Sequence, residues 1–175
     1  MTYTDSILSV YRRASADDIR EGMSWYRDTN LIAREAGNVE TGAGIIAALS
    51  PRLPWSRNVM LARQAFVAPL EGGALRRSIA AANAILSGTH PLDVLGGLKT
   101  RSFFDNILMP LSSEAVTVDT HAIKIAGLDR DSVTPRMYRE IADAYRSAAY
   151  SVNLRPLEIQ AITWTTWRRE RGGVR

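Results

Sequence analysis

The stretch Val116-Thr117-Val118-Asp119-Thr120-His121-Ala122 is the most informative part of the sequence. Three β-branched residues precede Asp119, and a helical pattern follows it to about Ala126. The run is too short to found a sheet, so we expect it to anchor the acid at the first turn of a helix, where the helix dipole keeps a carboxylate ionised. Facing a cleft, such a carboxylate can stabilise a developing cation or activate a water molecule. As a plain N-cap, it only satisfies its own helix. The residues alone leave both interpretations open.

Apolar residues recur at helical spacing over nearly the whole chain, which predicts an all-α protein. Ser15 and Thr134 are typical N-caps, and Gly37 is a typical helix stop. The segment 89–97, punctuated by proline and glycine, indicates a short irregular connector. The predicted helices cover residues 4–13, 16–36, 41–49, 55–67, 75–86, 99–109, 119–126, 135–152 and 156–169.

The composition excludes several classes of protein. A chain of 175 residues suits one domain, at most one built from two helical lobes. The absence of cysteine excludes disulfides, thiolate zinc sites and cysteine-held iron–sulfur clusters, and two histidines are too few for a histidine-rich metal site. We therefore expect no metal and no cofactor. No apolar run reaches the roughly 18 residues of a membrane helix, and the first 13 residues lack the order of a signal peptide. We expect a soluble, cytoplasmic protein with no membrane contact, and no protein partner is evident.

The charged residues are biased toward arginine. The formal net charge is +4, and twenty arginines stand against two lysines, Lys99 and Lys124. A basic balance favours a polyanionic partner, and arginine suits bidentate phosphate contacts. A codon bias toward arginine explains the ratio equally well.

Two further segments contain residues that suit nucleic acid. In Leu95-Gly96-Gly97-Leu98-Lys99-Thr100, the glycines allow backbone N–H groups to approach a phosphate. The small apolar run from Ile45 leads to Ser50, Pro51 and Arg52, and Trp55 follows. Trp55 can stack on an extruded base, worth ~1–3 kcal/mol, or serve equally well as an amphipathic core residue.

The last predicted helix carries Trp164 and Arg168. We interpret Trp164 as a core residue. Arg168 can contact a phosphate, although a solvated cation at a helix C-terminus is the simpler interpretation.

Together, these segments resemble the helix-hairpin-helix DNA glycosylase superfamily in their order and spacing. The run Val118-Asp119-Thr120-His121 is similar to a motif of endonuclease III and adenine glycosylases, whose aspartate is the catalytic carboxylate and whose histidine is mainly supportive. Residues 95–100 resemble a degraded hairpin, in which Lys99 matches the lysine that attacks the sugar C1′ in bifunctional members. The adjacency of Gly96 and Gly97 departs from the family pattern, and so does Arg52, which stands where the family often has glutamine.

The resemblance covers roughly residues 40–170 and extends to a compact bacteriophage subgroup with α-glutamyl/putrescinyl-thymine pyrophosphorylase-like members, which implies a phage source and the host-cell cytoplasm. It implies a two-lobed enzyme that binds duplex DNA, extrudes a modified base into a cleft between the lobes and cleaves its N-glycosidic bond. Asp119 and Lys99 are the expected catalytic residues, with AP lyase activity if Lys99 is the nucleophile. The expected substrate-binding and DNA-binding residues are Ser50, Arg52, Trp55, Gly96, Gly97, Thr100, His121 and Arg168.

Three alternatives stay open. A transferase of the same fold would add an amine or amino acid to an activated 5-hydroxymethyl pyrimidine in DNA, with Asp119 as the general base. An inactive DNA-binding module would suit the weak hairpin. A regulatory helical protein unrelated to DNA is the third.

Overall fold

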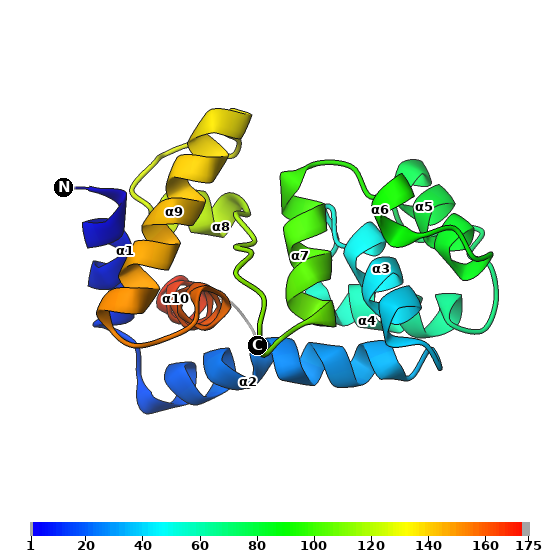
Figure 1. Cartoon of the computed structure of the whole chain (residues 1–175), viewed down its shortest axis with the longest axis horizontal. Coiled ribbons are helices and arrows are strands. Elements are labelled where there is room, and N and C mark those ends of the chain that lie inside the picture. The colour runs from blue at the N-terminus through cyan, green and yellow to red at the C-terminus, as the bar shows by residue number, and fades with distance from the viewer. Residues whose placement is uncertain (1, 173–175) are drawn as a thin grey trace. The chain divides into compact units, whose positions relative to one another are not determined.

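The computed structural model describes residues 2–172, which form ten α-helices and no strand (Figure 1). This confirms the prediction of an all-α fold. The helices are α1 (Tyr3–Tyr11), α2 (Ala16–Arg34), α3 (Val39–Leu49), α4 (Trp55–Ala65), α5 (Arg76–Leu86), α6 (Pro91–Val94), α7 (Leu98–Leu108), α8 (Thr120–Ile125), α9 (Pro135–Ser151) and α10 (Pro156–Glu170).

Most helix boundaries lie within two residues of the predicted ones, and one predicted connector is wrong. Residues 91–94 form the single turn α6, where a connector was expected. His90 caps this turn, because its Nδ1 atom accepts a hydrogen bond from the Leu92 N–H at 3.2 Å. Pro91 at the first helical position has a backbone already set for a helix. Four residues are too few to show an apolar period, so the pattern gave no sign of this turn.

The chain divides into two compact units. Unit 1 comprises Met1–Tyr26 and Ser112–Arg175, and unit 2 comprises Arg27–Leu111. Helix α2 contributes its first turns to unit 1 and its last turns to unit 2.

The core of unit 1 is formed by α1, α8, α9 and α10. Helix α9 packs against both α1 and α10 (Figure 1). Gly22 on α2 permits a close approach to α10, because a Cβ atom there would lie 2.5 Å from the Ile162 Cα atom. The largest fully buried side chains of this core are Ile7, Ile125, Ile141, Tyr145, Ile159 and Ile162.

The core of unit 2 is built around α3, which packs against α4, α5 and α7 (Figure 1). Every residue from Gly42 to Leu49 is buried, as expected for a helix that is apolar on all sides. Gly44 lies against Pro91, where a Cβ atom would come within 2.7 Å of the proline ring. None of the helices within residues 2–172 combines the length and apolar composition needed to cross a membrane.

Candidate functional site

Asp119 is the N-cap of α8 and is half-buried. Its Oδ1 atom accepts a hydrogen bond from the Ala122 N–H at 2.8 Å. The helix is anchored by Ala122, Ile123 and Ile125, which are all buried in the unit 1 core. The Oδ2 atom makes no hydrogen bond to any residue between 2 and 172. One oxygen therefore orients the carboxylate, and the other is left for a further partner.

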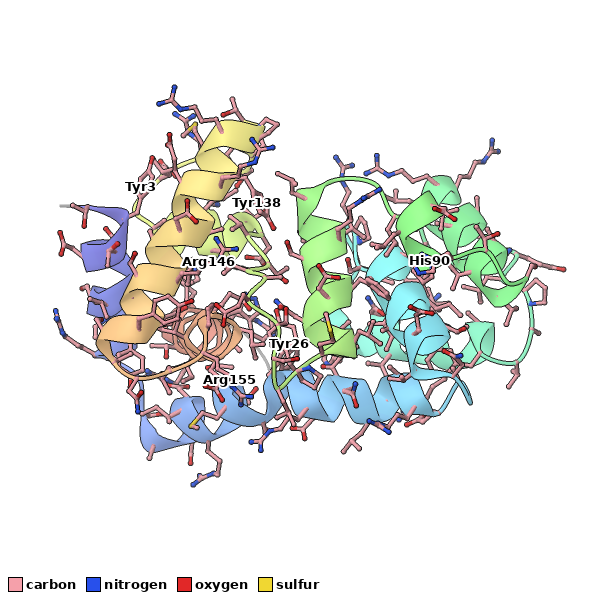
Figure 2. All side chains as sticks on the ribbon, viewed as in Figure 1. Tyr3, Tyr26, His90, Tyr138, Arg146 and Arg155 are labelled. Atoms are coloured by element: carbon pink, nitrogen blue, oxygen red, sulfur yellow. The ribbon has the colours of Figure 1, made fainter. Side chains whose placement is uncertain are left out.

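The segment before Asp119 is held by Tyr138 of α9. The Tyr138 hydroxyl donates to the Val116 carbonyl at 2.8 Å and accepts from the Val118 N–H at 3.1 Å. Figure 2 shows Tyr138 on the side of α9 that faces this segment. One side chain thus satisfies two backbone groups that a neighbouring strand would satisfy in a sheet. Sequence reasoning missed Tyr138, because nothing in a helical pattern shows which segment 22 positions away a tyrosine will reach.

A buried polar layer lies on the same segment. The Tyr26 hydroxyl (Figure 2) donates to Gln160 Oε1 at 2.8 Å and lies within hydrogen-bonding distance, 3.2 Å, of Thr117 Oγ1. Tyr145 is completely buried, and this burial raises the pKa of its phenol far above the usual value. The nearby Thr163 hydroxyl acts in the opposite direction, and the negative charge of Asp119 adds a smaller rise to the pKa of Tyr145.

His121 and Arg168 belong to an aromatic and cationic cluster in unit 1. The Trp164 ring lies 4.9 Å from the Trp25 ring at a tilt of 51°, and the His121 ring meets Trp164 edge-on at 6.4 Å between centroids. The Arg168 guanidinium carbon lies 4.6 Å from the centroid of Trp164. All four side chains are partly exposed, so the interpretation of Trp164 as a core residue is wrong. The neighbours of Trp164 are two aromatic rings and a guanidinium. These groups carry polar N–H atoms, which favour a position of Trp164 near the surface of unit 1.

The glycine pair lies between α6 and α7 in unit 2. Gly97 is the N-cap of α7 with a φ of 78°, a left-handed conformation that glycine adopts without strain. Arg101 holds this loop, because its Nε and Nη2 atoms each donate at 2.9 Å, to the Leu95 and Leu92 carbonyls respectively. Both glycines are exposed.

Lys99 is partly exposed and forms no hydrogen bond or ion pair with any residue between 2 and 172. The other lysine, Lys124, differs, because its Nζ atom lies 2.9 Å from Asp131 Oδ1. Lys99 is therefore the lysine whose amine is not held by a carboxylate.

The loop after α3 contains the three remaining predicted residues. Ser50 is the C-cap of α3, and its hydroxyl donates to the Ala47 carbonyl at 2.9 Å. Arg52 is exposed and has a φ of 58°, which is uncommon for a residue with a side chain. Trp55 begins α4 and is partly exposed. Asn58 links the two helices that flank the loop, since its Nδ2 atom in α4 donates to the Ile46 carbonyl of α3 at 3.1 Å.

The predicted residues therefore fall into two groups. Asp119, His121 and Arg168 belong to unit 1, and the rest belong to unit 2. In unit 2, three of them line a common pocket: Gly96, Gly97 and Thr100. The same pocket is lined by two residues that sequence reasoning did not select, Arg77 and Ser78.

Within residues 2–172, no group of three or more His, Asp or Glu side chains has the arrangement of a metal site.

No curated protein and no solved structure matches the chain. The sequence does match the model of a family of unknown function (DUF7178), over residues 1–171. Since this match covers nearly all of the 175 residues, the chain belongs to the DUF7178 family.

Proposed function

We propose that the protein is a DNA glycosylase-like enzyme, which extrudes a modified base from DNA and cleaves its N-glycosidic bond with the help of Asp119. The observation that carries the proposal is how the two oxygens of this carboxylate are hydrogen-bonded. One oxygen is fixed by the Ala122 N–H at 2.8 Å, and the other has no partner within residues 2–172.

The chemistry follows from charge and orientation. Cleavage of an N-glycosidic bond develops positive charge on the sugar, and a fixed carboxylate stabilises that charge or orients the attacking water. Such a group acts best when it does not need to reorganise during the reaction. Tyr138 supplies this rigidity through its two hydrogen bonds to the backbone before Asp119.

Unit 1 also contains a cluster of side chains that suits a nucleotide. The cluster of His121, Trp164, Trp25 and Arg168 offers partly exposed rings beside a cation. Base stacking on an aromatic face contributes ~1–3 kcal/mol and tolerates any base, which suits an altered one. Extrusion itself costs a few kcal/mol, and less when the base is mispaired or modified.

Lys99 is the proposed nucleophile for AP lyase chemistry. A Schiff base needs an unprotonated primary amine at C1′ of the sugar. Arginine cannot provide it, because its guanidinium stays protonated. Lys99 is the lysine without an ion pair in the described chain, whereas Lys124 is bound to Asp131.

Mass spectrometry of free bases and nucleosides tests the proposal. The full-length protein would be incubated with unmodified DNA and with hypermodified phage DNA. We expect free base from the wild type and none from Asp119→Asn, which retains an effective N-cap while losing the charge. The matched control is Asp5→Asn, since Asp5 is a capping carboxylate at the start of α1 in the same unit.

Release of free base by Asp119→Asn at the wild-type rate would overturn the assignment of Asp119. A heavier nucleotide in the strand, with no free base released, would replace hydrolysis by group transfer. Binding to DNA without any chemical change would reduce the protein to a DNA-binding module.

A further inference from the structure

Unit 2 contains a pocket with a volume of about 430 Å³. This volume lies in the range of small-molecule sites, roughly 300–1,000 Å³. The apolar part of its lining, called here the apolar wall, is formed by Ala48, Pro51, Ala81, Val94 and Leu95. The pocket is therefore larger than an inorganic ion requires and has a surface suited to a hydrophobic or planar group.

The polar side of the pocket is formed by the starts of α5 and α7. Each helix has 11 residues, and neither begins on a side chain that caps it: the N-caps are Leu75 and Gly97. Neither helix has an acid in its first turn. The free backbone N–H groups and the positive end of the dipole at each start favour an anion.

A buried side chain points to the same conclusion independently. Ser78 lines the pocket, is only 3% exposed, and its hydroxyl has no hydrogen-bond partner within residues 2–172. A buried hydroxyl without a partner is costly, so native proteins nearly always provide one. A ligand that reached the Ser78 hydroxyl from the pocket would supply the missing acceptor.

Two more side chains on the pocket wall are unengaged. Arg77 on α5 and Thr100 on α7 form no hydrogen bond or ion pair with the rest of the described chain. None of the residues that line the pocket is acidic. The lining thus offers a guanidinium, two hydroxyls and two helix starts, with no carboxylate to repel an anion.

We propose that this pocket binds the phosphate of a small organic phosphate the size of a mononucleotide. The phosphate lies between the starts of α5 and α7, where Arg77, Ser78 and Thr100 contact its oxygens, and the organic group packs on the apolar wall. The proposal goes beyond the function proposed above, because every residue that it uses belongs to unit 2 and none takes part in the chemistry of Asp119.

Calorimetric titration of the full-length protein provides the test. The probes are the four deoxynucleoside monophosphates, the matching nucleosides and inorganic phosphate. We expect a monophosphate to bind at least tenfold more tightly than both its nucleoside and inorganic phosphate. Arg77→Gln should weaken this binding at least tenfold. Arg76→Gln is the matched control, because it removes the same charge from the neighbouring position, which does not line the pocket.

Ser78→Ala separates a binding role from a structural one. The loss of an unpartnered buried hydroxyl should leave thermal stability unchanged or raise it, while monophosphate binding weakens several-fold. Unchanged binding in Ser78→Ala, or equal losses in Arg76→Gln and Arg77→Gln, would overturn the proposal.

The source of the phosphate is settled in parallel with a single-stranded oligonucleotide. If no monophosphate binds and only oligonucleotide binding depends on Arg77 in preference to Arg76, the pocket takes a strand phosphate and the small-ligand proposal is wrong. If neither class of probe binds at millimolar concentration, the pocket has no anion-binding role. Because these measurements involve no turnover, failure here is distinct from failure of the reaction assigned to Asp119.

Discussion

In unit 1, a side chain accepts a hydrogen bond at each helix start, although at α10 the acceptor is Glu158 of the first turn and not the N-cap residue Arg155; three helix starts in unit 2 lack any such acceptor. The acceptors in unit 1 are Thr2, Ser15, Asp119, Thr134 and Glu158, which serve α1, α2, α8, α9 and α10 respectively. In unit 2, helices α4, α5 and α7 begin at Pro54, Leu75 and Gly97, and none of these provides a cap.

Cations stand at helix starts in both units, but those of unit 1 are ion-paired: Arg136 with Glu140 in α9, and Arg155 with Glu158 in α10. The first turns of α4, α5 and α7 carry Arg57, Arg76, Arg77 and Lys99, although cations are unfavourable at the positive end of a helix dipole. Between residues 50 and 101 the chain has seven basic and two acidic residues. Unit 1 thus satisfies its own helix starts, whereas the exposed helix starts of unit 2 suit an anionic partner.

The sharpest way to test this division is covalent trapping with borohydride. If the enzyme is bifunctional, wild-type protein should be trapped on DNA, and Lys99→Gln should abolish the adduct completely. Lys124→Gln is the control, because Lys124 is a unit 1 lysine paired with Asp131 and should leave trapping intact. Denaturing electrophoresis of the protein–DNA adduct is the readout. Trapping that survives Lys99→Gln would show that the proposed hairpin correspondence is wrong.

Salt dependence gives the next largest effect. Phosphate contacts release counterions, so we expect the affinity for duplex DNA to fall about 10- to 100-fold between 50 and 200 mM salt if a few phosphates are bound. Fluorescence anisotropy at several salt concentrations measures the slope. Arg57→Gln, at the uncapped start of α4, should reduce the slope by about one ion. Arg136→Gln is the unit 1 control, since Arg136 pairs with Glu140. A slope near zero would remove DNA as the partner.

Asp18 tests whether unit 1 satisfies its own helix starts. Burial opposes ionisation of Asp18, but hydrogen bonds from Ser15 and the Arg169 guanidinium together hold its pKa below the usual value. Its Oδ2 atom accepts from the Ser15 N–H at 2.8 Å and from Arg169 Nε at 2.9 Å, and the side chain is 3% exposed. We expect Asp18→Asn to lower the free energy of unfolding by about 1–3 kcal/mol at pH 7, because Arg169 loses the buried carboxylate with which it pairs.

The pH dependence follows from the direction of that shift in pKa. A lowered pKa in the folded state means that the stabilisation is present above the unfolded value of about 3.9 and is lost as the pH falls through the folded value. Urea unfolding at pH 7 and near pH 3 should therefore show a difference between Asp18→Asn and wild type that shrinks in acid. Asp17→Asn is the control, since Asp17 is exposed and pairs only with the exposed Arg20. A difference independent of pH would rule out a contribution from the charge.

The helices were predictable because their signals are local. Periodic apolar residues, and caps such as Ser15 and Thr134, lie within a few positions of the turns that they specify. The position of Asp119 at the start of α8 followed from the same kind of signal. The supports of the candidate sites did not, because Tyr138 reaches Val116 across 22 positions, and Ser78 and Thr100 line one pocket only once the chain has folded. Trp164 was misjudged for the same reason, since its partner Trp25 belongs to a distant helix.

The smallest expected effect addresses the uncapped helix starts directly. Ser56 is exposed in the first turn of α4, so Ser56→Glu places a negative charge where the dipole favours it. We expect the free energy of unfolding to rise by about 0.3–1 kcal/mol at low salt, and DNA affinity to fall, because the carboxylate occupies the position that suits a phosphate. Ser87→Glu is the matched control: Ser87 is the exposed C-cap of α5 in the same unit, where the same charge meets the negative end of a helix and should destabilise it. Urea unfolding and anisotropy measure the two effects. If both variants reduce DNA affinity equally, net charge alone governs binding, and the uncapped starts of unit 2 have no special role.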